Sequence, residues 1–197
     1  MSKRLAHPRD LTPSAFVREC AERVIRACGG KPILDVACGS GRNGLYLASF
    51  GCEVVFVDRD LSQFHDRERF ASFAIDLARD HWPFPPRTLG GIIDVHFLLP
   101  GLFPHFAASA APGAYLLLET VPGCGRNYRE LPKAGRLRNA LAETFDVEVY
   151  REGKIGPSDI DAVTVRFLGR RRSDEQGCAI RTSSEVLSSA SVEGDGP

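Results

Sequence analysis

Apolar and polar positions alternate along the chain with two different periods. Four segments place apolar residues at helical spacing, and a fifth does so more weakly. We therefore expect helices at 12–28, 42–50, 101–111 and 132–144, and a weaker one at 61–71. Between them lie short apolar runs bounded by glycine, proline or charged residues, which are typical of buried strands. These strands are expected at 32–38, 52–58, 73–76, 92–99, 114–121, 146–153 and 161–170.

The order of these elements predicts the fold class. Thr12 or Ser14 is a suitable cap for the first helix, and Gly29 with Gly30 would end it. Strands that alternate with helices form a doubly wound parallel sheet, whereas the last two runs are joined by only a short loop and should pair antiparallel. We expect an α/β fold: a Rossmann-like, seven-stranded sheet, mostly parallel with an antiparallel last strand, and helices on both faces.

The chain has the size of one domain. It contains 197 residues, and 43% of them are apolar, which is enough to line one core. We divide it into an N-terminal arm at 1–12, a folded domain at 13–170 and a tail at 171–197. The tail is rich in serine and poor in large apolar residues, so we expect it to be disordered.

Charge and composition exclude several classes of partner. Lysine plus arginine equals aspartate plus glutamate at 25 each, so no long-range field favours nucleic acid or an anionic membrane. The first ten residues contain no apolar signal-peptide core, and we expect a cytoplasmic protein. The six cysteines form no C-x-x-C pair and no metal-like spacing with the histidines, so we expect reduced thiols and no metal.

The sequence ILDVACGSGRNG at 33–44 carries the first candidate chemistry. Gly39, Gly41 and Gly44 satisfy the G-x-G-x-x-G pattern between an expected strand and an expected helix. The next strand ends in Asp58, 19 residues after Gly39. A carboxylate at that point can accept hydrogen bonds from both hydroxyls of a ribose. Together these residues predict a ligand that contains adenosine.

Asp35 distinguishes an adenosine ligand that carries a diphosphate from one that carries a cation. It lies four residues before Gly39. A carboxylate beside the loop disfavours a diphosphate and favours a ligand with an ammonium or sulfonium group. S-adenosylmethionine has both cations and no phosphate. Asp35 can also hydrogen-bond the amides of the loop itself, which is compatible with this role.

These motifs resemble a known family. D-V-A-C-G-S-G-R-N at 35–43 with V-V-F-V-D at 54–58 is similar to the cofactor motifs of class I S-adenosylmethionine-dependent methyltransferases. C-G-x-G-R after a P-S-x-F-V helix at 13–17 resembles the small methyltransferases related to the tellurite-resistance enzymes. The likeness covers roughly 13–168, including E-T at 119–120 and L-P-x-x-G-x-L-R at 131–138.

The resemblance implies roles for individual residues. Asp35, Gly39 and Gly41 would line the methionine side of the cofactor, Asp58 would bind the ribose, and Asp76 with Leu77 would flank the adenine. The full candidate set for S-adenosylmethionine is Asp35, Ala37, Cys38, Gly39, Gly41, Asn43, Asp58, Arg59, Asp76, Leu77 and Val95.

His96 is the candidate catalytic residue, since the resemblance places it near the transferable methyl. Histidine changes charge near neutral pH and can accept a proton from a methyl acceptor. On an apolar strand, however, it can equally be a hydrogen-bonded packing residue. His105 is a second candidate that can simply be exposed, and Trp82 can either stack on adenine or pack at the sheet edge.

The sequence therefore predicts a methyltransferase that acts on a small-molecule acceptor such as a thiol, a chalcogen oxyanion or another small nucleophile. D-V-H-F at 94–97 replaces the N-P-P-Y type of motif found in enzymes that methylate DNA bases, which argues against a nucleic-acid acceptor. Two alternatives are an NAD(P)-dependent oxidoreductase, which Arg59 beside Asp58 favours, and a catalytically inactive cofactor-binding subunit.

Overall fold

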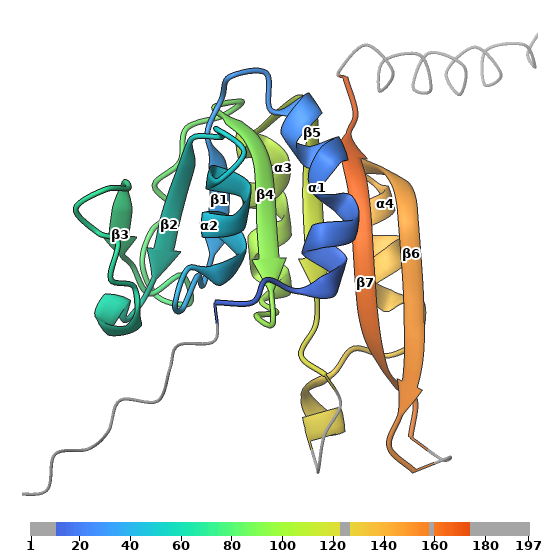
Figure 1. Cartoon of the computed structure of the whole chain (residues 1–197). Coiled ribbons are helices and arrows are strands. Elements are labelled where there is room, and N and C mark those ends of the chain that lie inside the picture. The colour runs from blue at the N-terminus through green and yellow to red at the C-terminus, as the bar shows by residue number, and fades with distance from the viewer. Residues whose placement is uncertain (1–10, 123–126, 158–159, 174–197) are drawn as a thin grey trace, which may run out of the picture.

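A seven-stranded sheet forms the centre of the molecule in the computed structural model, which describes residues 11–122, 127–157 and 160–173 (Figure 1). The strand order is β3-β2-β1-β4-β5-β7-β6. The strands are β1 Ile33–Val36, β2 Val54–Asp58, β3 Ser72–Ala74, β4 Leu89–Val95, β5 Ala110–Glu119, β6 Phe145–Ile155 and β7 Ala162–Arg171.

Helices cover both faces of this sheet. In Figure 1, α1 and α2 lie in front of it, and α3 and α4 lie behind it. The helices are α1 Ala15–Ala27, α2 Arg42–Ala48, α3 Phe103–Ser109 and α4 Arg136–Ala142, and the short 3-10 turns are η1 Leu61–Gln63, η2 Pro100–Leu102 and η3 Asn127–Glu130.

The pairing of the strands confirms the predicted fold class. β1 pairs in parallel with β2 and β4, and β5 pairs in parallel with β4. β7 is antiparallel to both β5 and β6, because it returns between them after the short connection from β6. The parallel strands therefore end at one edge of the sheet, where the loops that follow them come together.

The core consists of two apolar layers, one on each face. Val17, Val24 and Leu47 belong to the layer under α1 and α2, and Phe106 and Leu141 belong to the layer under α3 and α4. Ser14 caps α1 by accepting a hydrogen bond from the N–H of Phe16 at 3.1 Å, which confirms one of the two expected caps.

The expected helix at 61–71 is wrong. Only η1 forms there, and turns follow it. Leu61 and Phe64 are buried in this segment, while most of the remaining residues are exposed. Two buried side chains are too few for an apolar stripe that would hold a longer helix against the sheet.

The fourth strand lies earlier than the expected 92–99. It begins at Leu89 and passes through two glycines that resemble a turn in the sequence. A Cβ at Gly90 would lie 2.4 Å from the carbonyl oxygen of Cys28, so glycine permits two backbones to approach closely. The strand ends before His96, whose φ of 65° is in the left-handed region.

The fifth strand also begins earlier than the expected 114. It includes Pro112 and Gly113, which form an irregularity in its pairing with β4: Leu89 aligns with Ala110, whereas Gly91 aligns with Tyr115. β7 reaches Arg171, and the remainder of the expected tail from 174 onward lies outside the described residues, as does most of the N-terminal arm.

Candidate cofactor and acceptor site

The glycine loop connects β1 to α2 and is shaped by close packing. Gly41 is the N-cap residue of α2 and has a φ of 78°. A Cβ at Gly44 would lie 2.5 Å from the ring of Phe56 and 2.7 Å from Oδ2 of Asp35. The third glycine of the motif therefore allows α2 to pack directly against β2 and β1.

Asp35 lies beneath this loop and caps α2. Gly41 has no side chain to cap the helix, and Oδ2 of Asp35 accepts a hydrogen bond from the N–H of Gly44 at 2.9 Å instead. Burial of the side chain raises its pKa to about 7, and the nearby charge of Asp58 raises it as well. The structure thus shows Asp35 bonded to a backbone amide at the start of α2, and Asp35 does not line the cavity described below.

Asp58 ends β2 and holds two neighbouring backbone groups. Oδ2 accepts from the N–H of Gly39 at 2.8 Å, and Oδ1 accepts from the N–H of Asp60 at 3.0 Å. A carboxylate oxygen has two lone pairs, so each oxygen retains one for a further donor. The Asp58 carboxylate therefore fixes the position of the loop and can still bind a ligand.

A cavity of about 380 Å³ opens beside Asp58. Apolar side chains, two carboxylates and one guanidinium line it. Its lining residues are Ala37, Asp58, Arg59, Ile75, Asp76, Leu77, Ala78 and Phe97. Five of them are in the set predicted from the sequence.

Three lining residues were not predicted. Ile75 and Ala78 flank Asp76 and Leu77, so their proximity in the sequence could have indicated them. Phe97 was missed because the fourth strand was expected to extend to residue 99, and a residue inside a strand would not reach the loops at the sheet edge. Asp76 itself accepts a hydrogen bond from the N–H of Ala78 at 3.1 Å, which shapes the turn after β3.

The other predicted residues do not line the cavity. Cys38 and Val95 are buried in the layer beneath α1 and α2. Gly39 donates to Asp58, and Gly41 faces the Phe64 ring, which lies 2.6 Å from an ideal Cβ. Asn43 is buried, and its side-chain oxygen accepts from the N–H of Ser14 at 2.9 Å.

His96 occupies the turn immediately after β4. Its side chain is exposed, and its N–H donates to the carbonyl oxygen of Glu119 at 2.7 Å. Its Nδ1 lies 3.4 Å from Nη2 of Arg42. The pKa of His96 is lowered, mainly by desolvation and further by the charge of Arg42, while Glu119 opposes this change. The exposed position of the ring does not agree with the packing role.

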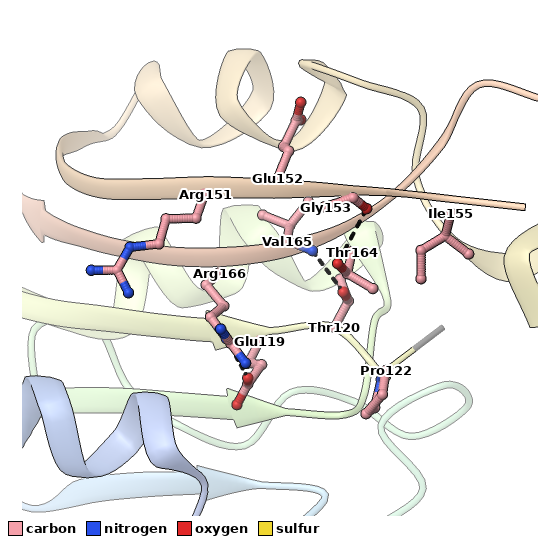
Figure 2. A pocket seen from close by; sticks show the side chains of 10 residues that line it. All are labelled: Glu119, Thr120, Pro122, Arg151, Glu152, Gly153, Ile155, Thr164, Val165 and Arg166. Atoms are coloured by element: carbon pink, nitrogen blue, oxygen red, sulfur yellow. Dashed lines mark hydrogen bonds and ion pairs between the residues drawn. The ribbon is translucent and has the colours of Figure 1, made fainter. Parts of the chain in front are cut away.

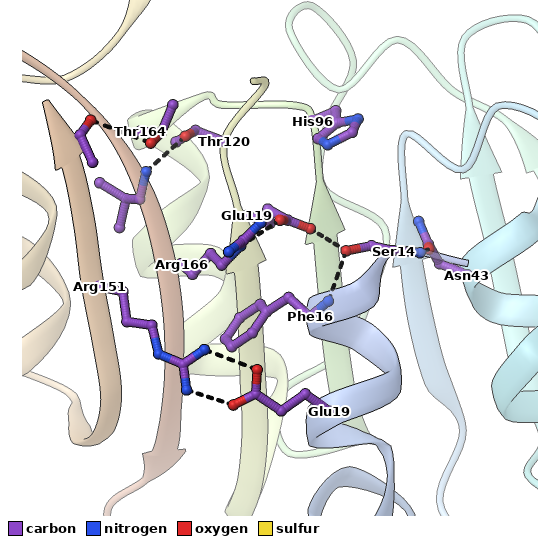
Figure 3. Close-up of polar contacts among 12 residues, drawn as sticks. Ser14, Phe16, Glu19, Asn43, His96, Glu119, Thr120, Arg151, Thr164 and Arg166 are labelled. Carbon is purple, nitrogen blue, oxygen red and sulfur yellow. Dashed lines mark hydrogen bonds and ion pairs between the residues drawn. The ribbon is translucent and has the colours of Figure 1, made fainter. Parts of the chain in front are cut away.

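Glu119 joins three elements at the same edge (Figure 3). Its buried carboxylate accepts from the hydroxyl of Ser14 at the start of α1 and from Nε of Arg166 on β7, the latter at 2.7 Å. Arg151 of β6 makes a separate two-bond pair with Glu19 of α1. The sequence indicated the acid at the strand end but not this network, because the partners of Glu119 are more than 40 residues away along the chain.

A second cavity of about 330 Å³ begins at Glu119 (Figure 2). It lies over the ends of β5, β6 and β7, where Oγ1 of Thr120 accepts from the N–H of Val165 at 2.8 Å. Its lining residues are Glu119, Thr120, Pro122, Arg151, Glu152, Gly153, Ile155, Thr164, Val165 and Arg166.

Two further candidates lie outside both cavities. His105 is exposed on α3 and stacks on Trp82 with ring centroids 5.7 Å apart. The Nε1–H of Trp82 donates to the hydroxyl of Ser109 at 2.8 Å. These contacts agree with an exposed histidine and a tryptophan that packs against the sheet layer.

Comparison with known proteins identifies relatives of this fold. Residues 10–73 match the family model of the tellurite resistance protein TehB. Haemophilus influenzae TehB is 17% identical, with a TM-score of 0.60, over 81% of this chain and 62% of that chain. A Burkholderia thailandensis 1,6-didemethyltoxoflavin-N1-methyltransferase, solved with S-adenosylhomocysteine, is 16% identical, with a TM-score of 0.53, over 81% of this chain and 79% of that chain.

A third structure comes from work on the conversion of a disulfide bond into a thioacetal group in echinomycin biosynthesis. It is 20% identical, with a TM-score of 0.60, and the alignment covers 88% of this chain and 91% of that chain. No curated protein sequence matches the chain significantly. No helix among the described residues is long and apolar enough to span a membrane.

These findings confirm the fold predicted from the sequence: the chain has the fold of the class I S-adenosylmethionine-dependent methyltransferases. Over residues 10–73 its sequence matches that of the TehB family. This matched stretch contains the glycine loop, Asp35 and Asp58.

The raised pKa of Asp35 predicts a pH-dependent stability. Because the carboxyl binds its proton more tightly in the folded chain than in the unfolded chain, the free energy of unfolding should fall as pH rises from about 4 to about 7. Asp35→Asn keeps an acceptor for the N–H of Gly44 and has no proton to lose. We expect this variant to reduce the slope of the free energy of unfolding against pH, by at most about 1.4 kcal/mol per pH unit.

Urea denaturation of the ligand-free protein at several pH values measures this slope. Glu68→Gln is the control, because Glu68 is an exposed acid. An unchanged pH dependence in Asp35→Asn would contradict the assignment.

Proposed function

We propose that this protein binds S-adenosylmethionine in the cavity beside Asp58 and transfers its methyl group to a small-molecule acceptor. One observation carries the proposal: residues from the turns after β1, β2, β3 and β4 meet in a single cavity, with the Asp58 carboxylate at its wall. A cavity of about 380 Å³ is within the range typical of small-molecule sites.

The residues present fit the adenosine part of the cofactor. The remaining lone pairs of Asp58 can accept from the ribose hydroxyls. Ile75, Leu77 and Phe97 supply the apolar surface that an adenine ring needs, and Asp76 lies beside them.

The same geometry argues against a dinucleotide. A diphosphate binds to the N–H groups at the start of the helix that follows the glycine loop. In this chain, the N–H of Gly44 already donates to Asp35, so this donor is not available to a diphosphate, and the buried acid adds negative charge beneath the loop. S-adenosylmethionine carries no diphosphate, which favours it over NAD(P).

The cofactor, when bound, supplies a methyl group on a sulfonium for in-line displacement. The chain then has to hold the acceptor in line with that methyl and to exclude water. Orientation of this kind can contribute about 7–11 kcal/mol. The protein therefore needs no metal to lower the barrier for a good nucleophile such as a thiolate.

We assign the second cavity to the acceptor. It begins at Glu119, whose carbonyl oxygen binds the N–H of His96, so it is adjacent to the end of β4. At about 330 Å³ it suits a small molecule. Two arginines and two glutamates line it, which leaves no net charge to select a strongly charged polymer.

His96 is the proposed catalytic residue. Because Arg42 faces Nδ1, the neutral ring would accept at Nδ1 and carry its proton on Nε2. In that tautomer, His96 positions an acceptor by donating to it. The opposite tautomer would let Nε2 act as a base.

Removal of the Asp58 carboxylate should weaken cofactor binding. Asp58→Ala loses the bonds to the ribose and also releases Gly39, so we expect a loss of about 2–4 kcal/mol in the free energy of binding S-adenosylhomocysteine. Isothermal titration calorimetry measures the affinity, and circular dichroism checks the fold.

Asp60→Ala is the matched control. Asp60 also accepts from a backbone N–H, that of Ser62 at 2.8 Å, but it does not line the cavity. Equal affinities for Asp58→Ala and the unmodified protein would remove Asp58 from the site.

Replacement of His96 should reduce turnover without affecting the cofactor. His96→Asn is the informative variant, because asparagine tolerates the left-handed backbone at this position. We expect kcat to fall at least tenfold, because the variant loses one general acid–base or positioning contact. The affinity for S-adenosylhomocysteine should be unchanged.

The assay uses a panel of thiols, chalcogen oxyanions, phenols and amines with radiolabelled methyl donor. A fall in thermal stability without a fall in kcat would assign His96 to the structure of the turn. Tight cofactor binding with no turnover on any acceptor would favour the inactive-subunit alternative.

A further inference from the structure

Asp94 is a buried acid in the middle strand of the sheet that the proposed reaction does not use. Its side chain is 0% exposed. Within the described part of the chain, neither of its carboxylate oxygens has a hydrogen-bond partner. Burial of an ionised carboxylate without bonds is very costly, so such a group normally holds a proton.

The register of the sheet shows what surrounds Asp94. It aligns with Val36 of β1 and with Leu118 of β5, which both belong to the apolar layer beneath α3 and α4. Leu102 of η2 and Phe106 of α3 belong to the same layer. The two residues that align with Asp94 are therefore apolar, and so is the layer to which they belong.

The same layer reaches the cofactor cavity. Ala37 follows Val36 directly and lines the cavity, and Phe97, three residues after Asp94, lines it as well. Both pack against the layer that contains Val36 and Leu118. Asp94 therefore lies one residue inside the strand edge at which the cofactor would bind.

Asp35 is the one charged group that affects Asp94 in the described structure. Burial raises the pKa of Asp94 well above its ordinary value, and the charge of Asp35 raises it further. Asp35 lies on the neighbouring strand and also has a raised pKa. Their side chains lie on opposite faces of the sheet, since Asp35 bonds Gly44 of α2 whereas Asp94 aligns with residues of the layer beneath α3 and α4. The charge of Arg42 opposes the pKa shift of Asp35, whereas no cation among the described residues acts on the pKa of Asp94.

We propose that Asp94 loses its proton when S-adenosylmethionine binds, and that its carboxylate then serves as the buried counter-charge of the cofactor's sulfonium. The O–H bond of the carboxyl breaks, its electron pair stays on the carboxylate oxygen, and the proton goes to solvent. This inference rests on the proposed function, because it takes S-adenosylmethionine as the ligand.

The charge of the ligand gives the inference a specific consequence. S-adenosylmethionine carries a sulfonium, whereas S-adenosylhomocysteine has a neutral thioether in the same place. Opposite charges attract strongly where water is excluded. Binding of the sulfonium should therefore release a proton that binding of the thioether does not, and the protein should prefer the methyl donor over the product.

Isothermal titration calorimetry of the full chain at pH 7, in phosphate and in Tris, measures the protons released by each ligand. We expect more release with S-adenosylmethionine than with S-adenosylhomocysteine. In Asp94→Asn, which replaces a neutral carboxyl by an amide of the same shape, this difference should disappear. The preference for S-adenosylmethionine should fall on the order of tenfold, which corresponds to one pKa unit.

Asp94→Leu is the second variant, since it fills the site without polar atoms and serves if the amide is not tolerated. Asp35→Asn tests the neighbouring acid. Equal proton release in Asp94→Asn and the unmodified protein would overturn the inference, and so would loss of the release only in Asp35→Asn. If neither ligand binds the unmodified protein, the proposed function itself fails; binding of both without a difference in proton release contradicts the role of Asp94 alone.

Discussion

The bonds from Asp35 and Asp58 to the backbone of the glycine loop determine the geometry of this site. The N-cap residue of α2 is Gly41, which has no side chain that could cap the helix. Asp35 supplies the cap from β1, and Asp58 anchors Gly39 from β2. Because β1 and β2 are parallel neighbours, the two acids hold the loop that follows β1 from both strands, and the cavity lies beside Asp58.

The two acids have different roles because their environments differ. Asp58 is partly exposed at the cavity wall, where its remaining lone pairs can bind a ligand. Asp35 is buried, and its Oδ2 accepts a hydrogen bond from the N–H of Gly44. On the other side of the site, Glu119 joins α1 and β7, so that the start of α1 contacts both the glycine-loop helix and the end of β5.

The sequence predicted the features that depend on local pattern. Alternating apolar runs and amphipathic segments predicted the sheet, and the glycine loop with Asp58 indicated the cavity. Features that depend on contacts between distant segments were missed. Gly90 is typical of a turn, and only the structure shows its close approach to Cys28. Phe97 was expected inside a strand. The partners of Glu119 come from α1 and β7, which are distant along the chain. The absence of any bond to Asp94 also requires the tertiary structure.

A crystal structure with S-adenosylhomocysteine would show whether the Asp58 carboxylate binds the ribose. We expect the ribose hydroxyls within hydrogen-bond distance of that carboxylate. The adenine should lie among Ile75, Leu77 and Phe97, with the sulfur directed toward His96 and Glu119. An adenosine bound outside the cavity beside Asp58, with its ribose away from that carboxylate, would contradict this assignment.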